Sequence, residues 1–276
     1  MKDKYSAVWV SHSSISDYLK CPRAYYLRNV YRDPKTNRKI SIIEPPLALG
    51  QVVHDTIERL SKLPTEDRFT TPLLETFEIL WQNVSGPKGG FHDNEQELVF
   101  KTRARSMIDR VSKHPGPLVR KAIKIRADLP YYWLSDDDNI ILCGKVDWLE
   151  YKEDTDSVRI IDFKTGKFDE DPDSLQLPIY YLLASRTQTK PITGMAYWYL
   201  DRDDEPIDMP LPDVESVEKK ILELGKKVAL ARKLGHFVCR ENGCRACRPY
   251  EAILAGRAIH VGINTYGQDL YILSQT

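Results

Sequence analysis

The octapeptide RIIDFKTG, residues 159–166, carries an acid and a lysine inside an otherwise apolar run. If this run forms a strand, successive side chains alternate between its two faces, so Asp162 and Lys164 share one face and Phe163 points to the other. A buried Asp/Lys pair is costly unless both groups are satisfied. The stretch therefore predicts either a structural ion pair or a strand that delivers a carboxylate and an ammonium to a functional site.

Length and composition indicate a globular protein. A chain of 276 residues can bury a substantial core as one large domain or two small ones, and its 42% hydrophobic and 29% charged residues are typical of a soluble protein. No apolar run approaches the roughly 20 residues of a membrane span. The first residues lack the apolar stretch of a signal peptide. We therefore expect a cytoplasmic protein that has no membrane partner.

The order of elements predicts a mixed α/β fold with a largely helical first half. Apolar periodicity predicts helices over 13–30, 47–62, 173–187 and 213–234, and two more within 71–114. Strands are predicted for KAIKIRADLPYYWL, NIILCGKVDWLEY, VRIIDFK and TGMAYWYL, and a loop for 31–46. No GxGxxG or P-loop stands between a strand and a helix, so the fold is not expected to be a nucleotide-binding one, and any helicase must be a partner chain.

Charge is balanced overall but unevenly distributed. The formal net charge is zero, which argues against a generally basic surface that coats nucleic acid. Residues 101–126 nevertheless hold nine basic residues against one acid, and residues 201–218 are strongly acidic. Such a run is usually a solvated face, but this one is our candidate for a strand-binding surface, with Arg103, Arg105, Arg110, Arg120, Lys121 and Lys124 as phosphate contacts. The aromatic residues at 131–133 either stack on bases or belong to the core.

A second carboxylate is expected to join the first. Asp147 lies fifteen positions before Asp162, and the polar segment KEDTDS between them predicts a hairpin that brings both carboxylates to one end of a sheet. Two carboxylates and a lysine suit a divalent metal such as Mg²⁺ or Mn²⁺, which takes oxygen ligands, polarises a phosphate and activates water. His54 alone is more typical of a packed or surface residue. Gln176 and Tyr180 share a helix face if that helix continues through Pro178.

Taken in order, these pieces resemble the RecB-type branch of the PD-(D/E)XK nuclease superfamily, including its iron–sulfur and CRISPR-associated exonucleases. The matching segments are SSISDYLKCPRAYYL, ALGQVVHDTIE, CGKVDWLE, IIDFKTG and QLPIYYLLA. Each motif is short, but five in the right order over residues 11–185 form a specific signal.

The resemblance implies a role for each matching position. His54, Asp147, Asp162 and the main-chain carbonyl of Phe163 would bind the metal. Lys164 would be the catalytic lysine. Gln176 and Tyr180 would position the active site and the DNA strand.

Many members of this branch hold a 4Fe–4S cluster with one early and three late cysteines, and here the match is imperfect. Cys21, Cys244 and Cys247 fit three of the ligands, but Ile253 stands where the last cysteine is expected. We expect Cys239 to supply the fourth ligand in its place. Four thiolates can hold either an iron–sulfur cluster or a zinc ion. The third alternative is that the four cysteines are reduced and bind no metal. Cys143 is expected to be a small core residue.

The resemblance implies a restriction-endonuclease-like mixed sheet flanked by helices, in a single nuclease domain over 1–276. Residues 1–120 would be its helical part and 121–202 its sheet core. Residues 203–276 would pack a helix and a Cys-rich tail against the N-terminal helix.

The implied function is a metal-dependent exonuclease acting on single-stranded DNA ends, in DNA repair, recombination, replication or CRISPR adaptation, with a helicase, recombination or CRISPR protein as partner. Two alternatives remain: a non-catalytic DNA-binding subunit, which would not need an intact His54, Asp147, Asp162 and Lys164, and a structural protein with a buried ion-pair network. In the last case, changing Lys164 would affect no DNA activity.

Overall fold

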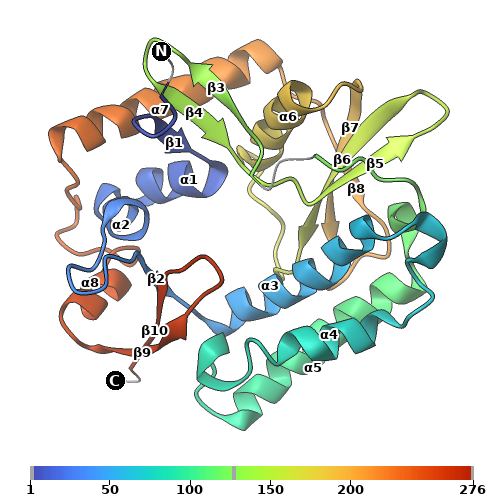
Figure 1. The fold of residues 1–276 in the computed structure, drawn as a ribbon, viewed down its shortest axis with the longest axis horizontal. Coiled ribbons are helices and arrows are strands. Elements are labelled where there is room, and N and C mark those ends of the chain that lie inside the picture. The colour runs from blue at the N-terminus through green and yellow to red at the C-terminus, as the bar shows by residue number, and fades with distance from the viewer. Residues whose placement is uncertain (1–2, 126–128, 275–276) are drawn as a thin grey trace.

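The computed structural model describes residues 3–125 and 129–274, which form a mixed α/β fold (Figure 1). Its helices are α1 (His12–Lys20), α2 (Pro22–Tyr25), α3 (Pro45–Glu58), α4 (Leu73–Trp81), α5 (Asn94–Lys113), α6 (Gln176–Thr187), α7 (Val214–Leu234) and α8 (Arg248–Leu254). A π-helical turn, η1 (Tyr26–Val30), follows α2, and short 3₁₀ turns are η2 (Arg59–Lys62), η3 (Thr65–Asp67), η4 (Gly86–Gly89) and η5 (Gly116–Val119). Its strands are β1 (Val8–Val10), β2 (Ile40–Ile42), β3 (Tyr131–Ser135), β4 (Ile140–Cys143), β5 (Trp148–Lys152), β6 (Ser157–Lys164), β7 (Ile192–Tyr199), β8 (Ile207–Met209), β9 (Ala258–Ile263) and β10 (Asp269–Leu273).

The largest described sheet has the order β5-β6-β7-β8, and β6 is one of its two inner strands. β5 and β6 form the predicted antiparallel hairpin, which places Trp148 opposite Ile161. β6 and β7 are parallel, so the chain crosses between them through α6, because parallel neighbours cannot be joined by a tight turn. This register sets the end of β6 beside the end of β7, with Asp162 opposite Tyr197 and Lys164 opposite Tyr199.

The two faces of β6 pack against different helices, as the alternation of side chains predicts. Ile161 and Phe163 enter a core that α3, α4 and α5 cover, and Figure 1 shows these three helices together on that side of the sheet. Ile160 belongs to a separate cluster with Leu177 of α6. Asp162 and Lys164 therefore face α6.

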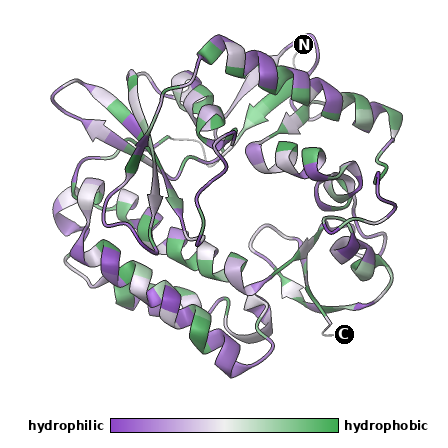
Figure 2. Ribbon diagram, turned by 180° about the vertical axis from the view of Figure 1, so that it is seen from behind, coloured by the Kyte–Doolittle hydropathy of each residue, from purple (hydrophilic) through white to green (hydrophobic). Residues whose placement is uncertain are grey.

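Two smaller sheets flank this unit, with the orders β1-β4-β3 and β2-β10-β9. α1, α6 and α7 pack around the first of them through apolar residues that include Ile15, Leu182 and Val228. α7 is amphipathic, and Figure 2 shows hydrophobic and hydrophilic residues interleaved along it. None of the helices within the described residues is long and apolar enough to span a membrane.

The prediction of one strand over NIILCGKVDWLEY is wrong. The run divides into β4 and β5, which lie in different sheets. Gly144 stands at the break, where a Cβ would come within 2.9 Å of Leu183 Cδ1 on α6. The chain turns here because a residue without a side chain lets the backbone pass close to that helix.

Other predicted boundaries also shift. The helix over 13–30 breaks at Cys21, which is extended because the proline that follows disfavours a helical conformation in the residue before it. The predicted loop over 31–46 contains β2 and the first residues of α3. The strand predicted over 121–134 is found in its last part, where Tyr131–Ser135 form β3, whereas near its start Ala122 forms an isolated bridge to Glu150. Arg126 lies outside the described residues.

Candidate active site

Strand β6 ends in a buried ion pair. Asp162 is 1% exposed, and its Oδ2 lies 2.9 Å from Lys164 Nζ. The same ammonium lies 2.9 Å from Glu170 Oε2 and donates to Gln176 Oε1. Because an ammonium has three N–H donors, Lys164 faces a protein acceptor with each of them. Burial lowers the pKa of Lys164, but Asp162 and Glu170 outweigh it and raise that pKa above its ordinary value.

Asp147 joins this strand to α3. Its Oδ2 accepts a hydrogen bond of 3.0 Å from the Phe163 N–H and lies 3.3 Å from His54 Nδ1. Burial lowers the pKa of His54, but the Asp147 carboxylate more than compensates and raises it to about 9. Burial likewise opposes ionisation of Asp147, and the His54 imidazolium keeps the pKa of that carboxyl below its usual value.

Asp162 is the incompletely satisfied member of the site. Its Oδ1 accepts a hydrogen bond of 2.8 Å from Gln176 Nε2, whereas its buried Oδ2 has the Lys164 ammonium as an ion-pair partner at 2.9 Å and meets no further donor among the described residues. Burial, followed by repulsion from Asp147, raises the pKa of Asp162 to about 7. A buried carboxylate oxygen with one donor has an unused lone pair and can accept a second partner. A divalent cation beside Asp147 and Asp162 would satisfy it.

Helix α6 supplies the groups that hold this pair. Gln176 is its first residue, so Pro178 falls in the first turn, where a missing N–H costs no helical hydrogen bond. Gln176 and Tyr180 consequently share a face, and Gln176 Nε2 lies 3.2 Å from the Tyr180 hydroxyl oxygen. One glutamine amide thereby contacts Asp162, Lys164 and Tyr180.

The structure adds Glu58 to the groups near the predicted metal. Ligand atoms of His54, Glu58 and Asp147 all lie within 4.8 Å of one another. Glu58 also forms an ion pair with Lys145. The sequence signal for this residue is its spacing, because a carboxylate four positions after His54 lies on the same helix face. Glu170, in contrast, lies in the loop after β6, and no spacing connects it with Lys164.

The predicted strand-binding arginines of α5 are engaged within the protein. Arg105 pairs with Glu78, and Arg110 pairs with Asp204. Arg103 donates to the Thr165 carbonyl at 2.7 Å and to Asp201 Oδ2 at 3.1 Å. The basic segment 101–126 therefore meets the acidic segment 201–218 through two of these pairs.

The remaining predicted contacts lie beyond α5. Arg120 pairs with the fully buried Glu150, and the Lys121 ammonium lies 5.2 Å from the centre of the Tyr151 ring. Lys124 lines a surface hollow together with Tyr131. Of the aromatic run, Tyr132 packs against the α6–α7 core, whereas Tyr131 is 38% exposed and lies against Trp9.

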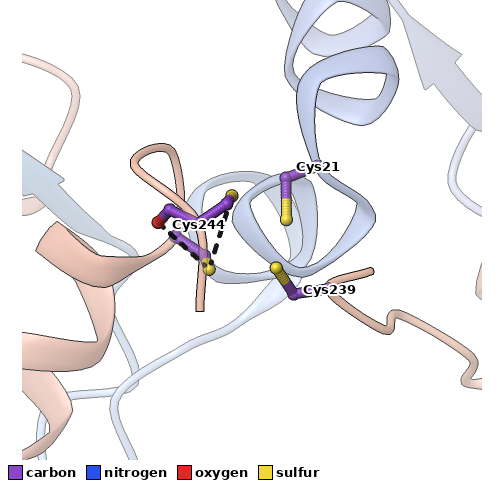
Figure 3. A group of neighbouring side chains, drawn as sticks. Cys21, Cys239 and Cys244 are labelled. Atoms are coloured by element: carbon purple, nitrogen blue, oxygen red, sulfur yellow. Dashed lines mark hydrogen bonds between the residues drawn. The ribbon is translucent and has the colours of Figure 1, made fainter. Parts of the chain in front are cut away.

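The four cysteines come together at the junction of α1, α2 and the C-terminal segment. The Sγ atoms of Cys21, Cys239, Cys244 and Cys247 all lie within 4.8 Å of one another. Figure 3 shows the sulfur atoms of Cys21 and Cys239 facing each other across this group. Backbone N–H donors, Gly243 first, lower the pKa of the Cys239 thiol to about 6, whereas burial raises that of Cys247 to about 12. Cys143 is separate and buried in β4, as predicted.

An Asp-x-Lys pair beside a second aspartate and a histidine is a set of groups that suits a divalent metal and phosphoryl chemistry. The family model of the PD-(D/E)XK nuclease superfamily matches residues 9–253. The chain belongs to this superfamily.

The fold is also found in a solved structure. The crystal structure named "Putative exonuclease" from Eubacterium rectale is similar with a TM-score of 0.50 and 12% sequence identity, over 93% of this chain and 91% of that one. A search of curated proteins finds no match. The predicted family and its restriction-endonuclease-like mixed α/β fold are therefore confirmed.

Proposed function

We propose that the protein is a metal-dependent deoxyribonuclease that hydrolyses phosphodiester bonds at DNA ends. The observation that carries the proposal is that four groups from separate segments of the sequence come together at the end of β6, where His54 Nδ1 lies 3.3 Å from Asp147 Oδ2 and Lys164 Nζ lies 2.9 Å from Asp162 Oδ2. A member of a nuclease superfamily that keeps these groups together has what hydrolysis requires.

The carboxylates of Asp147 and Asp162, the His54 imidazole and the Phe163 carbonyl would hold Mg²⁺ or Mn²⁺. Oxygen-rich ligand sets suit both ions. When bound, the ion supplies a polarised phosphate and a water of lowered pKa. Glu58 would complete the ligand set from α3.

The protein's own groups orient the reaction. Lys164 stays protonated at neutral pH, because its pKa is raised, and its ammonium would orient the attacking water and stabilise negative charge that develops on the phosphate. Gln176 fixes Lys164 and Asp162 relative to each other. Tyr180 lies against that amide and keeps its proton, because burial raises its pKa well above the ordinary value.

Single-stranded DNA ends are the substrate that we propose, with Arg105, Arg120, Lys121 and Lys124 as contacts to phosphates. The Arg105–Glu78 pair lies at the surface and can be exchanged for a phosphate contact at little cost, because exposed pairs contribute only about 0–1 kcal/mol. Arg120, in contrast, would have to leave the fully buried Glu150 to reach a phosphate. A helicase or another recombination or CRISPR protein would supply the unwound strand.

The decisive experiment is cleavage of end-labelled single-stranded, end-labelled double-stranded and closed circular DNA with Mn²⁺, Mg²⁺ or EDTA, by wild type and Asp162→Asn. We expect metal-dependent release of the label from linear DNA, an intact circle and an inactive variant. Cleavage of the circle would make the protein an endonuclease. DNA binding without cleavage by wild type under any metal would establish the alternative, a non-catalytic scaffold.

A second metal site accompanies this one. Four cysteines from the two ends of the chain form a closed set of sulfur ligands, which suits a 4Fe–4S cluster or zinc. These two cofactors hold their sulfur ligands at different separations.

A further inference from the structure

The sulfur atoms of the cysteine group lie as close together as the ligands of a single ion. All four are within 4.8 Å of one another, and those of Cys244 and Cys247 are 3.7 Å apart. Zinc binds thiolates at about 2.3 Å, so a tetrahedral site places its sulfur atoms about 3.8 Å apart. In a 4Fe–4S cubane each cysteine binds a different iron, which holds the sulfur atoms farther apart. We propose that Cys21, Cys239, Cys244 and Cys247 bind one structural zinc ion in place of the iron–sulfur cluster that the resemblance implies.

The replaced cysteine supports this assignment. Ile253 occupies the position of the expected last cluster ligand, and it is 9% exposed in an apolar cluster with Ile40 and Ile42. Its side chain therefore packs the small β2-β10-β9 sheet against α8. Cys239, upstream of Cys244, would be the fourth ligand, so three of the ligands lie within nine consecutive residues.

The loop that carries these three ligands is tightly curled. Gly243 has φ +121°, Asn242 has φ +51°, and the Gly243 N–H donates to Cys239 Sγ at 3.4 Å. The N–H of Cys247 bonds to the Cys244 carbonyl at 3.2 Å. The Cys244-x-x-Cys247 spacing is one that structural zinc sites use, and the Gly243 N–H stabilises the nearby Cys239 sulfur.

The site is closed and joins the two ends of the chain. Four protein ligands leave no position for substrate, as in structural zinc sites. Cys21 enters from the break between α1 and α2, and next to it Arg23 pairs at 2.6 Å with Glu251, 228 positions away. Zinc binding would therefore contribute directly to the folding of the C-terminal segment, and the ion itself would undergo no redox change.

The test is the metal content of the whole chain purified without oxygen and without added metal. We expect one zinc per chain, no iron or acid-labile sulfide, and no visible absorbance. Iron and sulfide in cluster stoichiometry would overturn the proposal, and so would a folded protein that contains no metal. The readout is independent of DNA cleavage, so its failure and that of the nuclease proposal are distinguishable.

Variants assign the ligands. Cys239→Ser should lose the zinc and lower the thermal unfolding midpoint, and Cys143→Ser, the matched control in β4, should keep its zinc. Cys239→His should retain about one zinc, because Cys₃His is a normal zinc set. If Cys239→Ser does not fold, the zinc content of Cys239→His tests whether residue 239 is a zinc ligand. A Cys239→His protein that contains iron and sulfide, or no metal, would contradict the proposal.

Discussion

Lys164 Nζ lies 2.9 Å from Asp162 Oδ2 on the face of β6 that is turned toward α6. The pair is buried, and Gln176 contacts both members. A buried ion pair contributes little net stability, because desolvation offsets the Coulomb attraction. Stability alone therefore does not explain the arrangement, whereas a site that needs a fixed ammonium beside a metal-binding carboxylate does.

Replacing Lys164 by methionine removes the ammonium and keeps most of the side-chain volume. We expect Lys164→Met to cleave DNA about 10²- to 10³-fold more slowly, the usual effect of removing one preorganised donor to developing charge, while Mn²⁺ still binds. Label release at saturating Mn²⁺ and Mn²⁺ titration calorimetry measure the two effects. If Lys164→Met cleaves DNA as fast as wild type, Lys164 takes no part in the reaction.

Much of this site could be predicted from sequence because strand alternation and helix spacing are local rules. The face shared by Asp162 and Lys164, the β5–β6 hairpin and the face shared by Gln176 and Tyr180 all follow from them. Glu170 could not be predicted, since it reaches Lys164 through an irregular loop. The break at Gly144 was also missed, because it depends on contact with α6, which is a tertiary effect.

Arg103 shows why charge runs are poor guides to function. Its guanidinium binds the carbonyl of Thr165, the residue after Lys164, and pairs with Asp201. Both partners are more than sixty positions away in sequence, so the pattern of α5 alone suggested a phosphate contact. The geometry indicates that Arg103 holds the turn that directly follows Lys164.

We expect Arg103→Lys to reduce kcat about 10- to 100-fold, as for groups that orient active-site residues, because an ammonium cannot reproduce the guanidinium fork. DNA affinity and its salt dependence should change little. Fluorescence anisotropy over a salt series and steady-state cleavage separate the two effects. Arg28→Lys, which alters a surface pair with Asp17, is the matched control. If Arg103→Lys keeps the wild-type kcat but binds DNA more weakly, Arg103 contacts a phosphate, as the sequence alone predicted.

Glu58 should contribute to metal affinity. We expect Glu58→Gln to bind Mn²⁺ about 10- to 100-fold more weakly, because the amide keeps the shape but loses the charge next to His54 and Asp147. Titration calorimetry measures this directly, with Glu75→Gln on the exposed side of α4 as control. If Glu58→Gln and wild type bind Mn²⁺ with equal affinity, Glu58 is not a metal ligand and its role is limited to the ion pair with Lys145.

Addition of metal should also stabilise the folded protein. A ligand that binds only the native state stabilises it by about 2.7 kcal/mol at 100 times its Kd. The unfolding midpoint should therefore rise when Mn²⁺ is added to the EDTA-treated protein, and it should rise less in Glu58→Gln at the same Mn²⁺ concentration. An equal rise in both proteins would show that Glu58 is not a ligand.

Glu97 provides a pH test away from the metal sites. It accepts hydrogen bonds from Trp81 Nε1 at 2.8 Å, from Ser85 Oγ at 2.7 Å and from the Gly86 N–H at 2.7 Å. Burial opposes its ionisation, but these donors prevail and hold its pKa below the ordinary 4.5. Its stabilising contribution is therefore fully present above pH 4.5 and is lost as the pH falls through the lower, folded-state pKa.

We expect Glu97→Gln to be less stable than wild type by about 1–3 kcal/mol at pH 7, the range for hydrogen bonds to a charged group. The difference should shrink below pH 4.5, because wild type then loses the same charge. Urea unfolding of both proteins from pH 7 to pH 3 measures it. If the difference in unfolding free energy stays constant across this range, the hydrogen-bonding shape of glutamine, and not its missing charge, causes the loss. The Glu97 charge then does not stabilise the α4–α5 connection.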